Sequence, residues 1–324
     1  MNQPSSTRAG TAAPDAGRPF GWAGWLTRIP DSWRLLHVEG NTRRGRVDLG
    51  DEGAVLFRIT WATVTRRGVD VERVARRHLR RALPRDRRSD ELRSVAHESL
   101  DPLLHHAHNQ EQRDRYVGYA PATRRIFDIA CHRVNKRRDR LVRDLTIGRF
   151  TDQPDDQPRR WAFFSVAFIV PEGFGHEEAT LNLGDMRVRF VRRAGLTARE
   201  SLTVRHIYPA GLALARGDLD YWMRNMLAEL RPMYRPRRAG WLGRGAPATR
   251  QIDTPLGTAR VAELGLRSIL SPMAWRLARR MRFMLVHDEE HDQFIALQLA
   301  ARVERIDDLI RQVVAGLHWT DDSI

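Results

Sequence analysis

Ile29–Trp33 reads IPDSW, and Val170–Phe174 reads VPEGF. In each stretch a β-branched residue precedes proline, and an acidic residue, a small residue and a large aromatic residue follow. Proline fixes its own φ and biases the residue before it toward extended geometry, and the aromatic ring is then placed to close the end of a sheet. The recurrence predicts two related modules, each opened by one of these stretches.

The residues after each stretch predict strands followed by an amphipathic helix. Residues 34–64 hold three expected strands, and residues 69–83 place apolar side chains at near-helical spacing below an arginine-covered face. In the second half, LNLGD (181–185) matches VDLGD (47–51), and a later helix is expected after an N-cap at Asp218. The intervening segment 201–215 is interpreted as an additional strand pair, inserted in the second half only.

Each half then ends in a predicted hairpin. Strands over 124–131 and 140–150 flank a basic turn, and strands over 281–286 and 293–300 flank an acidic turn. A last helix is predicted over 303–313 in the second half, and the first half lacks its equivalent. The two turns occupy equivalent places in this alignment, so they are candidates to pair across the module interface or between subunits.

These patterns together predict an α+β protein of two related modules, each an antiparallel β-sheet packed against helices. A chain of 324 residues is long for one compact domain and natural for two. We expect a disordered N-terminal segment over 1–22, a first module over 23–152 and a second over 160–319. Thr151–Arg160, with two prolines and several charges, is interpreted as the linker, and 231–260 as a long surface loop.

The Pro–aromatic stretches and the element order resemble the Mog1/PsbP-like α+β family. In that family a strand carrying proline and an aromatic residue precedes antiparallel strands, a crossing helix, and a closing hairpin and helix. The likeness covers roughly residues 26–318 as two tandem copies. It implies a binding or accessory role with a protein partner and brings no catalytic residue.

Composition limits the classes of protein to consider. No run of 18 or more apolar residues occurs, and the N-terminus lacks the apolar region of a secretion signal, so a cytoplasmic protein is expected. Cys131 is the only cysteine and is interpreted as a small core residue. Trp22, Trp25 and Trp241 lie in Gly-rich segments and are candidate partner contacts.

The formal net charge of +15 makes a polyanion site a natural alternative. Lys136 is the only lysine, and such a preference for arginine is typical of codon bias in a GC-rich genome. If the first helix and the basic turn share a face, their side chains could engage the phosphates of a nucleic acid. The candidates are Arg76, Arg77, Arg80, Arg81, Arg133, Lys136, Arg137, Arg138 and Arg140.

HDEEHD (287–292) combines the residue types that bind zinc, manganese or iron. His287, Glu290 and His291 are therefore candidate metal ligands. A hairpin turn splays successive side chains, however, so a solvated acidic turn is the alternative interpretation.

No nucleophile elbow or phosphate-binding glycine motif is present in the sequence. We therefore expect a non-enzymatic binding, accessory or scaffold protein without a cofactor. Nucleic-acid binding through the arginine-rich first half is the alternative, and a metal-dependent enzyme is a distant third. The sequence does not decide whether the protein forms a homo-oligomer.

Overall fold

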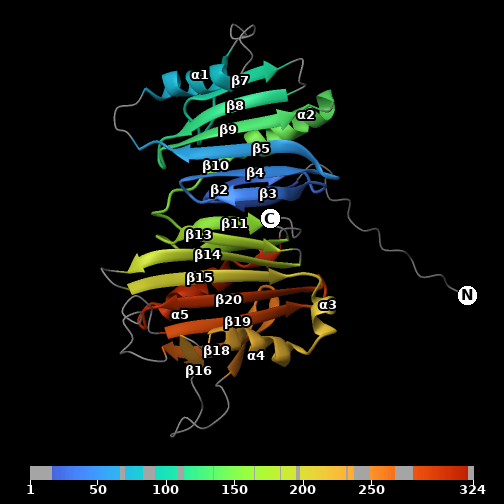
Figure 1. Ribbon diagram of the computed structural model, residues 1–324, viewed down its shortest axis with the longest axis vertical. Coiled ribbons are helices and arrows are strands. Elements are labelled where there is room, and N and C mark those ends of the chain that lie inside the picture. Colours follow the sequence, from blue (N-terminus) through green and yellow to red (C-terminus); the bar gives the residue numbers. More distant parts are fainter. Residues whose placement is uncertain are drawn as a thin grey trace, which may run out of the picture.

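A computed structural model describes residues 17–65, 70–82, 92–108, 113–133, 135–163, 165–182, 184–194, 198–230, 233–236, 249–266 and 280–319. Strands make up most of this described part and form three antiparallel sheets (Figure 1). The strands of the first half are β1 (Arg18–Trp22), β2 (Trp25–Ile29), β3 (Arg34–Gly40), β4 (Arg44–Asp51), β5 (Ala54–Thr63), β6 (Arg93–Val95), β7 (Leu103–His108), β8 (Arg113–Ala120), β9 (Arg125–His132) and β10 (Thr151–Asp152). Those of the second half are β11 (Arg159–Phe163), β12 (Val166–Val170), β13 (Gly175–Asn182), β14 (Asp185–Ala194), β15 (Ala198–Ile207), β16 (Tyr234–Pro236), β17 (Thr249–Thr254), β18 (Gly257–Leu266), β19 (Arg280–Asp288), β20 (Gln293–Ala301) and β21 (His318–Trp319).

The described helices are few and short. They are α1 (Val71–Ala82), α2 (Lys136–Val142) continued by the π-helical turn η2 (Arg143–Ile147), α3 (Ala210–Leu214), α4 (Leu219–Leu230) and α5 (Ile306–Ala315). Among the described residues, no helix combines the length and the apolar character needed to cross a membrane.

The central sheet is built from both halves of the chain. Its order is β10-β2-β1-β11-β12-β21, and β1 pairs antiparallel with β11 through Gly21 and Ala162. The hairpin β1–β2 leads directly into IPDSW, and the hairpin β11–β12 leads directly into VPEGF. Each Pro–aromatic stretch therefore marks the point at which the chain leaves the shared sheet for a sheet of its own.

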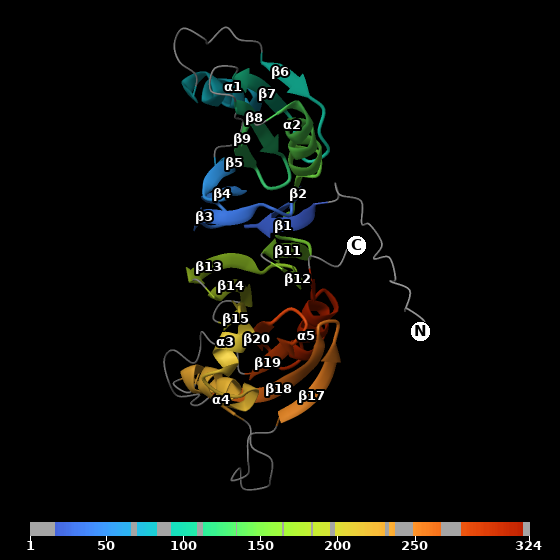
Figure 2. The same cartoon turned by 90° about the vertical axis from the view of Figure 1, so that its right-hand side faces the viewer.

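The other two sheets run through the same order of elements. The first is β3-β4-β5-β9-β8-β7-β6, and the second is β13-β14-β15-β20-β19-β18-β16 with β17 added on β18. A helix follows the third strand in each, α1 or α4, and a helical segment leads back to the central sheet, α2–η2 or α5. We call β1–β10 with α1 and α2 the first module and β11–β21 with α3–α5 the second. Figure 2 shows the two modules at opposite ends of the molecule with the central sheet between them.

The Pro–aromatic stretches have the same local structure. The amide of Trp33 donates to the carbonyl of Pro30 at 3.0 Å, and the amide of Phe174 donates to the carbonyl of Pro171 at 3.3 Å. Both aromatic side chains are buried, with Trp33 packed on Phe57 of β5. Each aromatic residue comes directly after the turn at which the chain passes from the central sheet to the sheet of its module. The turn therefore directs the ring into the core between the two sheets.

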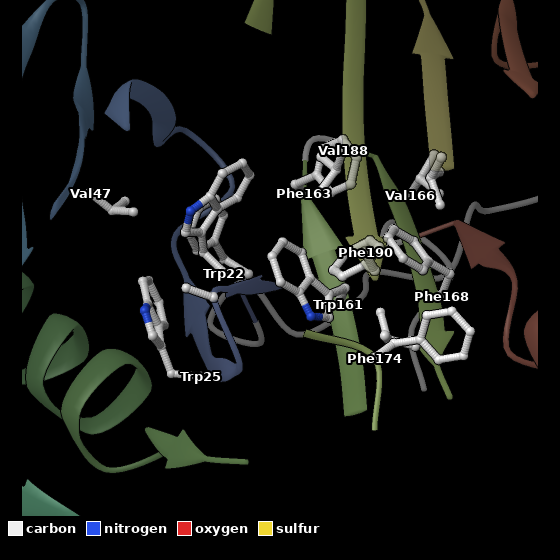
Figure 3. Packing of buried hydrophobic residues seen from close by; sticks show 14 of the residues in the cluster. Trp22, Trp25, Val47, Trp161, Phe163, Val166, Phe168, Phe174, Val188 and Phe190 are labelled. Atoms are coloured by element: carbon white, nitrogen blue, oxygen red, sulfur yellow. The ribbon is translucent and has the colours of Figure 1, made fainter. Parts of the chain in front are cut away.

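One hydrophobic core passes through the central sheet into both modules. It joins Trp22 of β1 to Trp161 of β11, whose ring centroids lie 5.4 Å apart, and continues to Phe190 of β14 (Figure 3). Trp22 and Trp25 are thus core residues and not surface contacts, while Trp241 lies outside the described residues. Because aromatic packing bridges β1 and β11, the modules are joined by a continuous interior.

The antiparallel sheets were predicted correctly, but the α+β class is wrong. The protein is mostly β, because the hairpins β1–β2 and β11–β12, which were not predicted, combine into a third sheet. The helices cover only part of each module's sheet: α1 contacts β7 and β8, and α4 contacts β16 and β19. The disordered segment expected over 1–22 was set too long, since Arg18–Trp22 form β1.

Three local predictions also differ from the structure. Most of the strand predicted over 140–150 is helical, since residues 140–147 belong to α2–η2; Val142 and Ile147 supply an apolar side that packs into the core. The first module therefore has the closing helical segment that it was expected to lack.

The second and third differences concern the alignment of the halves. The two Leu-Gly-Asp sequences do not occupy equivalent turns. Gly50 is near the end of β4, the second strand of its sheet, whereas Gly184 directly precedes β14, the second strand of the other sheet. The segment 201–215 is consequently no inserted strand pair: it contains β15, the counterpart of β5, and α3. The repeated Leu-Gly-Asp sequence contains residues that favour tight turns in general, so its recurrence does not show which strands of the two halves correspond.

Candidate functional site

The predicted metal ligands lie in the turn between β19 and β20. The Asp288 carboxylate accepts hydrogen bonds from the amides of Glu290 and His291 at 2.9 and 3.1 Å, and its second oxygen lies 2.9 Å from Nδ1 of His291. The His287 ring instead packs against Phe294. Within the described residues, no three His, Cys, Asp or Glu side chains are grouped as a metal site would require. The structure does not bring His287, Glu290 and His291 together as a ligand set.

The predicted polyanion residues lie on two opposite faces of the first module's sheet. Ala75 and Leu79 of α1 pack on Leu104 of β7, whereas Val142 of α2 belongs to the core on the side of Leu103. Successive strand residues point to opposite faces, so α1 and α2 are separated by the sheet (Figure 2). The condition that the first helix and the basic segment share a face is not met.

Several of these arginines also have carboxylate partners. Arg76 binds Glu72 at 2.6 Å, and Arg133 binds Asp114 at 2.6 Å. Arg77 and Arg140 are exposed, and the side chains of Arg80, Arg81, Lys136, Arg137 and Arg138 lie outside the described residues.

Arginines on the solvent-facing half of the same sheet are likewise engaged. Burial opposes ionisation of Asp48, yet hydrogen bonds from Arg46 and Arg58 hold the pKa of its carboxyl at about 2. A guanidinium already bound to a carboxylate is a weaker phosphate ligand, because that ion pair must first be broken. The arginine surplus therefore serves strand pairing in this part of the molecule.

Cys131 lies in the core as expected. It pairs with Phe57 across β5 and β9, and burial raises the pKa of its thiol. A protonated thiol in the interior is not a nucleophile.

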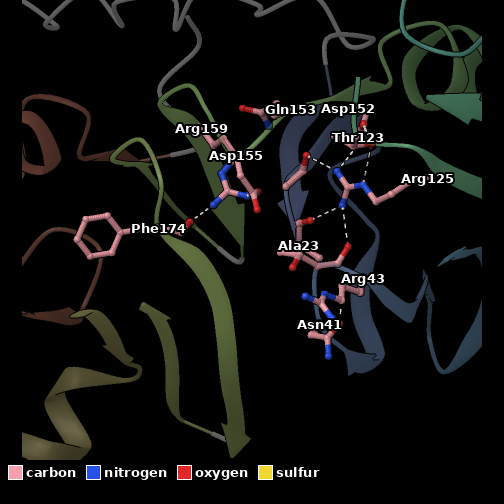
Figure 4. A network of polar contacts seen from close by, with 12 residues as sticks. Ala23, Asn41, Arg43, Thr123, Arg125, Asp152, Gln153, Asp155, Arg159 and Phe174 are labelled. Atoms are coloured by element: carbon pink, nitrogen blue, oxygen red, sulfur yellow. Dashed lines mark hydrogen bonds and ion pairs between the residues drawn. The ribbon is translucent and has the colours of Figure 1, made fainter. Parts of the chain in front are cut away.

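The stretch interpreted as a linker forms the most deeply buried ionic network of the described chain (Figure 4). Arg125, at the start of β9, binds Asp152 of β10 and donates to the carbonyls of Ala23 at 2.6 Å and Gly24 at 3.0 Å. Arg159, at the start of β11, binds Asp155 and the carbonyl of Phe174. Burial raises the pKa of Asp152 and lowers the pKa of both arginines.

The second module holds its own central hairpin in an equivalent way. Gln293 begins β20 as Arg125 begins β9, and its side-chain carbonyl accepts from Ser165 at 2.7 Å in the turn between β11 and β12. His206 of β15 binds the same oxygen. Both networks tie the turn of a central hairpin to the sheet of its module, which is a structural role.

Among the described residues, the two most exposed large apolar side chains lie at or just before α3 in the second module. Leu212 of α3 is 69% exposed and Tyr208, just before this helix, is 51% exposed. The two flank Ala210, which is buried together with Ala213 in the interior below α4. Alpha-helical periodicity therefore places Leu212 outward while its neighbours hold the helix down.

The backbone of α3 is fixed by its surroundings. The amide of Ala210 donates to the carbonyl of Asp292 at 2.6 Å, and the amide of Gly211 donates to the Asp292 carboxylate at 2.5 Å. The indole of Trp222 donates to the carbonyl of Ala213 at 2.9 Å. We define the α3 surface as Tyr208, Leu212 and the adjacent acidic turn Asp288–Asp292.

Sequence reasoning missed this surface. The available signal was Pro209 followed by residues with good helix propensity, which favours a short helix over a strand pair. The exposure of Leu212 had no local signal, because it depends on which residues α4 and β20 cover.

No family model and no curated protein matches the chain. Two solved structures are similar along its length, both of the immunity protein TplEi of T6SS from Pseudomonas aeruginosa. The apo form is 12% identical, covers 94% of this chain and 98% of its own, and has a TM-score of 0.30. The form complexed with "L" peptide is 14% identical, covers 94% and 99%, and has the same TM-score of 0.30. A TM-score this low supports no conclusion about this chain.

Proposed function

We propose that this chain is a protein-binding protein that acts without chemistry and that its partner contacts the α3 surface. The observation that carries the proposal is Leu212, whose side chain is 69% exposed on a helix anchored to β20 and α4. Single exposed apolar residues are common on protein surfaces. Leu212 differs because hydrogen bonds with Asp292 and Trp222 fix the helix that carries it, and because the exposed Tyr208 lies just before the same helix.

A fixed helical turn is a favourable place for a binding contact. An apolar side chain on a rigid element loses little conformational entropy on association, so most of its burial contributes to affinity. Tyrosine adds apolar area and a hydroxyl, and it is enriched among residues that dominate binding energy. Leu212 and Tyr208 both belong to the second module, so the proposed contact lies on that module.

The junction between the modules supports a binding role for the whole chain. The shared sheet and its continuous aromatic core fix one module relative to the other. A partner that contacts both modules would therefore meet a surface that is already ordered before binding.

Leu212→Asp is expected to weaken capture of a specific partner from the native host by at least about 30-fold, since loss of a dominant apolar contact costs about 2 kcal/mol or more. The measurement is quantitative mass spectrometry of proteins retained by the immobilised full chain, followed by the dissociation constant of the purified partner. Tyr208→Ala should reduce the same capture.

Leu36→Asp is the matched control. Leu36 is 38% exposed on β3 of the first module, so this variant adds the same charge at a distant apolar site and should retain the partner. Retention of the same proteins by the wild type and Leu212→Asp would overturn the proposal, provided that both unfold at the same temperature.

A further inference from the structure

The α3 surface carries an unusual charge. Asp288, Glu289, Glu290 and Asp292 place four carboxylates within five residues, on a chain whose formal net charge is +15. Glu289 and Glu290 are exposed, and Asp292 directly contacts the first turn of α3. The acidic turn therefore joins the α3 surface at Asp292, which contacts the residues between Tyr208 and Leu212.

These four carboxylates differ from other acids of this module, which form ion pairs with arginine. Asp185 binds Arg205, Glu177 binds Arg199, and Glu200 binds Arg192. In the turn, by contrast, the ion-pair contacts are with histidine: His291 with Asp288, and His287 with Glu289. Within the described part of the chain, no arginine or lysine forms an ion pair with any of the four.

The equivalent turn of the first module has the opposite character. The turn between β8 and β9 spans residues 121–124 and ends with Arg124, followed by Arg125. The acidic character at this position of the fold thus belongs to the turn of the second module and not to that of the first. The acidic turn is thus not the counterpart of the basic segment 132–140, which follows β9 as residues 302–305 follow β20.

We infer that the α3 surface binds a basic segment of a protein partner, one in which lysine or arginine side chains flank a large apolar residue. The apolar residue packs on Leu212 and Tyr208, and the cations lie against the acidic turn, where Glu289 and Glu290 are the exposed carboxylates. This inference rests on the proposed function and gives its partner a chemical class.

Local charge decides the recognition despite the positive net charge of the chain. At physiological ionic strength the Debye length is about 8 Å, so charges at the far module are screened. The acidic turn contacts the first turn of α3 through Asp292, so its charges act on the apolar contact at shorter range. Complementary charges at the edge of an apolar contact mainly raise the association rate and exclude wrong partners.

The experiment uses a phage-displayed library of random 16-residue peptides, selected on the immobilised full chain at low salt. Clones that bind the wild type and lose binding to Leu212→Asp are sequenced. We expect them to combine several Lys or Arg with Leu, Ile, Phe or Trp, and to bind more weakly as salt is raised.

A synthetic peptide from such a clone is then tested against Glu289→Lys/Glu290→Lys. The affinity should fall roughly tenfold, because two attractive contacts become repulsive. Glu98→Lys/Glu304→Lys is the matched control, since it changes the net charge equally at exposed positions away from α3. This control should bind the peptide as the wild type does.

Leu212-dependent clones that lack basic residues would overturn the inference and leave the proposed function standing, as would unchanged binding to Glu289→Lys/Glu290→Lys. The absence of any Leu212-dependent clone would also overturn it. The proposed function itself fails only if the host partner is retained by Leu212→Asp, which the capture experiment measures separately. Head-to-tail binding of a second copy, detected as Leu212-dependent dimers at high protein concentration, would contradict a heterologous basic partner.

Discussion

Arg125→Met is expected to lower the free energy of unfolding by about 3–5 kcal/mol, the usual cost of removing one partner of a buried ion pair. The side chains of Arg125 and Asp152 are only 4% and 2% exposed. Without the guanidinium, Asp152 is left buried without its counter-charge, and the carbonyls of Ala23 and Gly24 lose a donor. Burial already raises the pKa of Asp152, so its carboxyl should become protonated in the variant.

The measurement is urea unfolding of the full chain, followed by circular dichroism and tryptophan fluorescence. Arg58→Met is the matched control, because Arg58 is 43% exposed and Asp48 keeps Arg46 as a partner. Arg58→Met should lower the free energy of unfolding by about 1 kcal/mol or less. Arg125→Met/Asp152→Asn should recover part of the loss, since it removes the unpaired charge.

Equal destabilisation by Arg125→Met and Arg58→Met would contradict this account of the network. Such a result would mean that the segment 151–160 behaves as a simple linker and that its buried ion pair does not hold the turn between β1 and β2.

The second large effect is the loss of stability on acidification, which we assign to His176. This residue of β13 is buried among Trp22, Trp161 and Phe190, with ring centroids 5.2–6.0 Å away. Burial lowers the pKa of His176 to about 4, and the nearby positive charge of Arg159 acts in the same direction. The imidazole is therefore neutral in the folded protein at pH 7.

The direction of the effect follows from proton uptake. In the unfolded chain histidine titrates near its ordinary pKa of about 6.5. Between pH 6.5 and 4 the unfolded state binds a proton that the folded state does not, so stability falls as pH falls. One such group contributes about 1.4 kcal/mol per pH unit, or roughly 3 kcal/mol across this range, and the loss levels off below pH 4.

His176→Phe should remove this contribution while keeping an aromatic ring in the cluster. Urea midpoints of the wild type and the variant, measured from pH 7 to pH 4, should diverge as the pH falls, with the variant becoming relatively more stable. His37→Phe is the control, because the His37 side chain is 47% exposed. Parallel curves for the wild type and His176→Phe would show that the imidazole does not stay neutral in the core.

The location of His176 gives this pH dependence a structural meaning. Its ring contacts the central sheet at Trp22 and Trp161 and the second module's sheet at Phe190. Protonation would place a charge in the aromatic core where the modules meet. We therefore expect the fluorescence of the buried tryptophans to change before the circular dichroism of the strands.

Several elements could be predicted from the sequence because their signals are local. The apolar stripe of α1, the N-cap of α4 at Asp218 and the apolar runs of β19 and β20 each lie within a dozen residues. The closing turn of each Pro–aromatic stretch belongs to the same group. Proline, capping side chains and hydrophobic periodicity act over one or two turns of chain, so they can be recognised without a fold.

The candidate site was not predictable to the same degree. HDEEHD was recognised as an acidic turn, but its pairing with α3 depends on Asp292 meeting Gly211, about eighty residues away. The exposure of Leu212 depends on which of its neighbours are covered by other elements. Short motifs identify the groups that can react or bind, and they do not state which of them remain accessible.

The sequence by itself determined several of the strands, three of the helices and the two turns that open the modules, because short-range sterics and side-chain periodicity govern these features. Only the tertiary structure decided that β1 pairs with β11, that Arg125 and Arg159 are interior residues, and that α1 and α2 lie on opposite faces of one sheet. These outcomes depend on contacts between residues far apart in the chain. Burial of an aromatic core offsets the cost of bringing them together, and that energy is a property of the assembled sheets and not of any one segment.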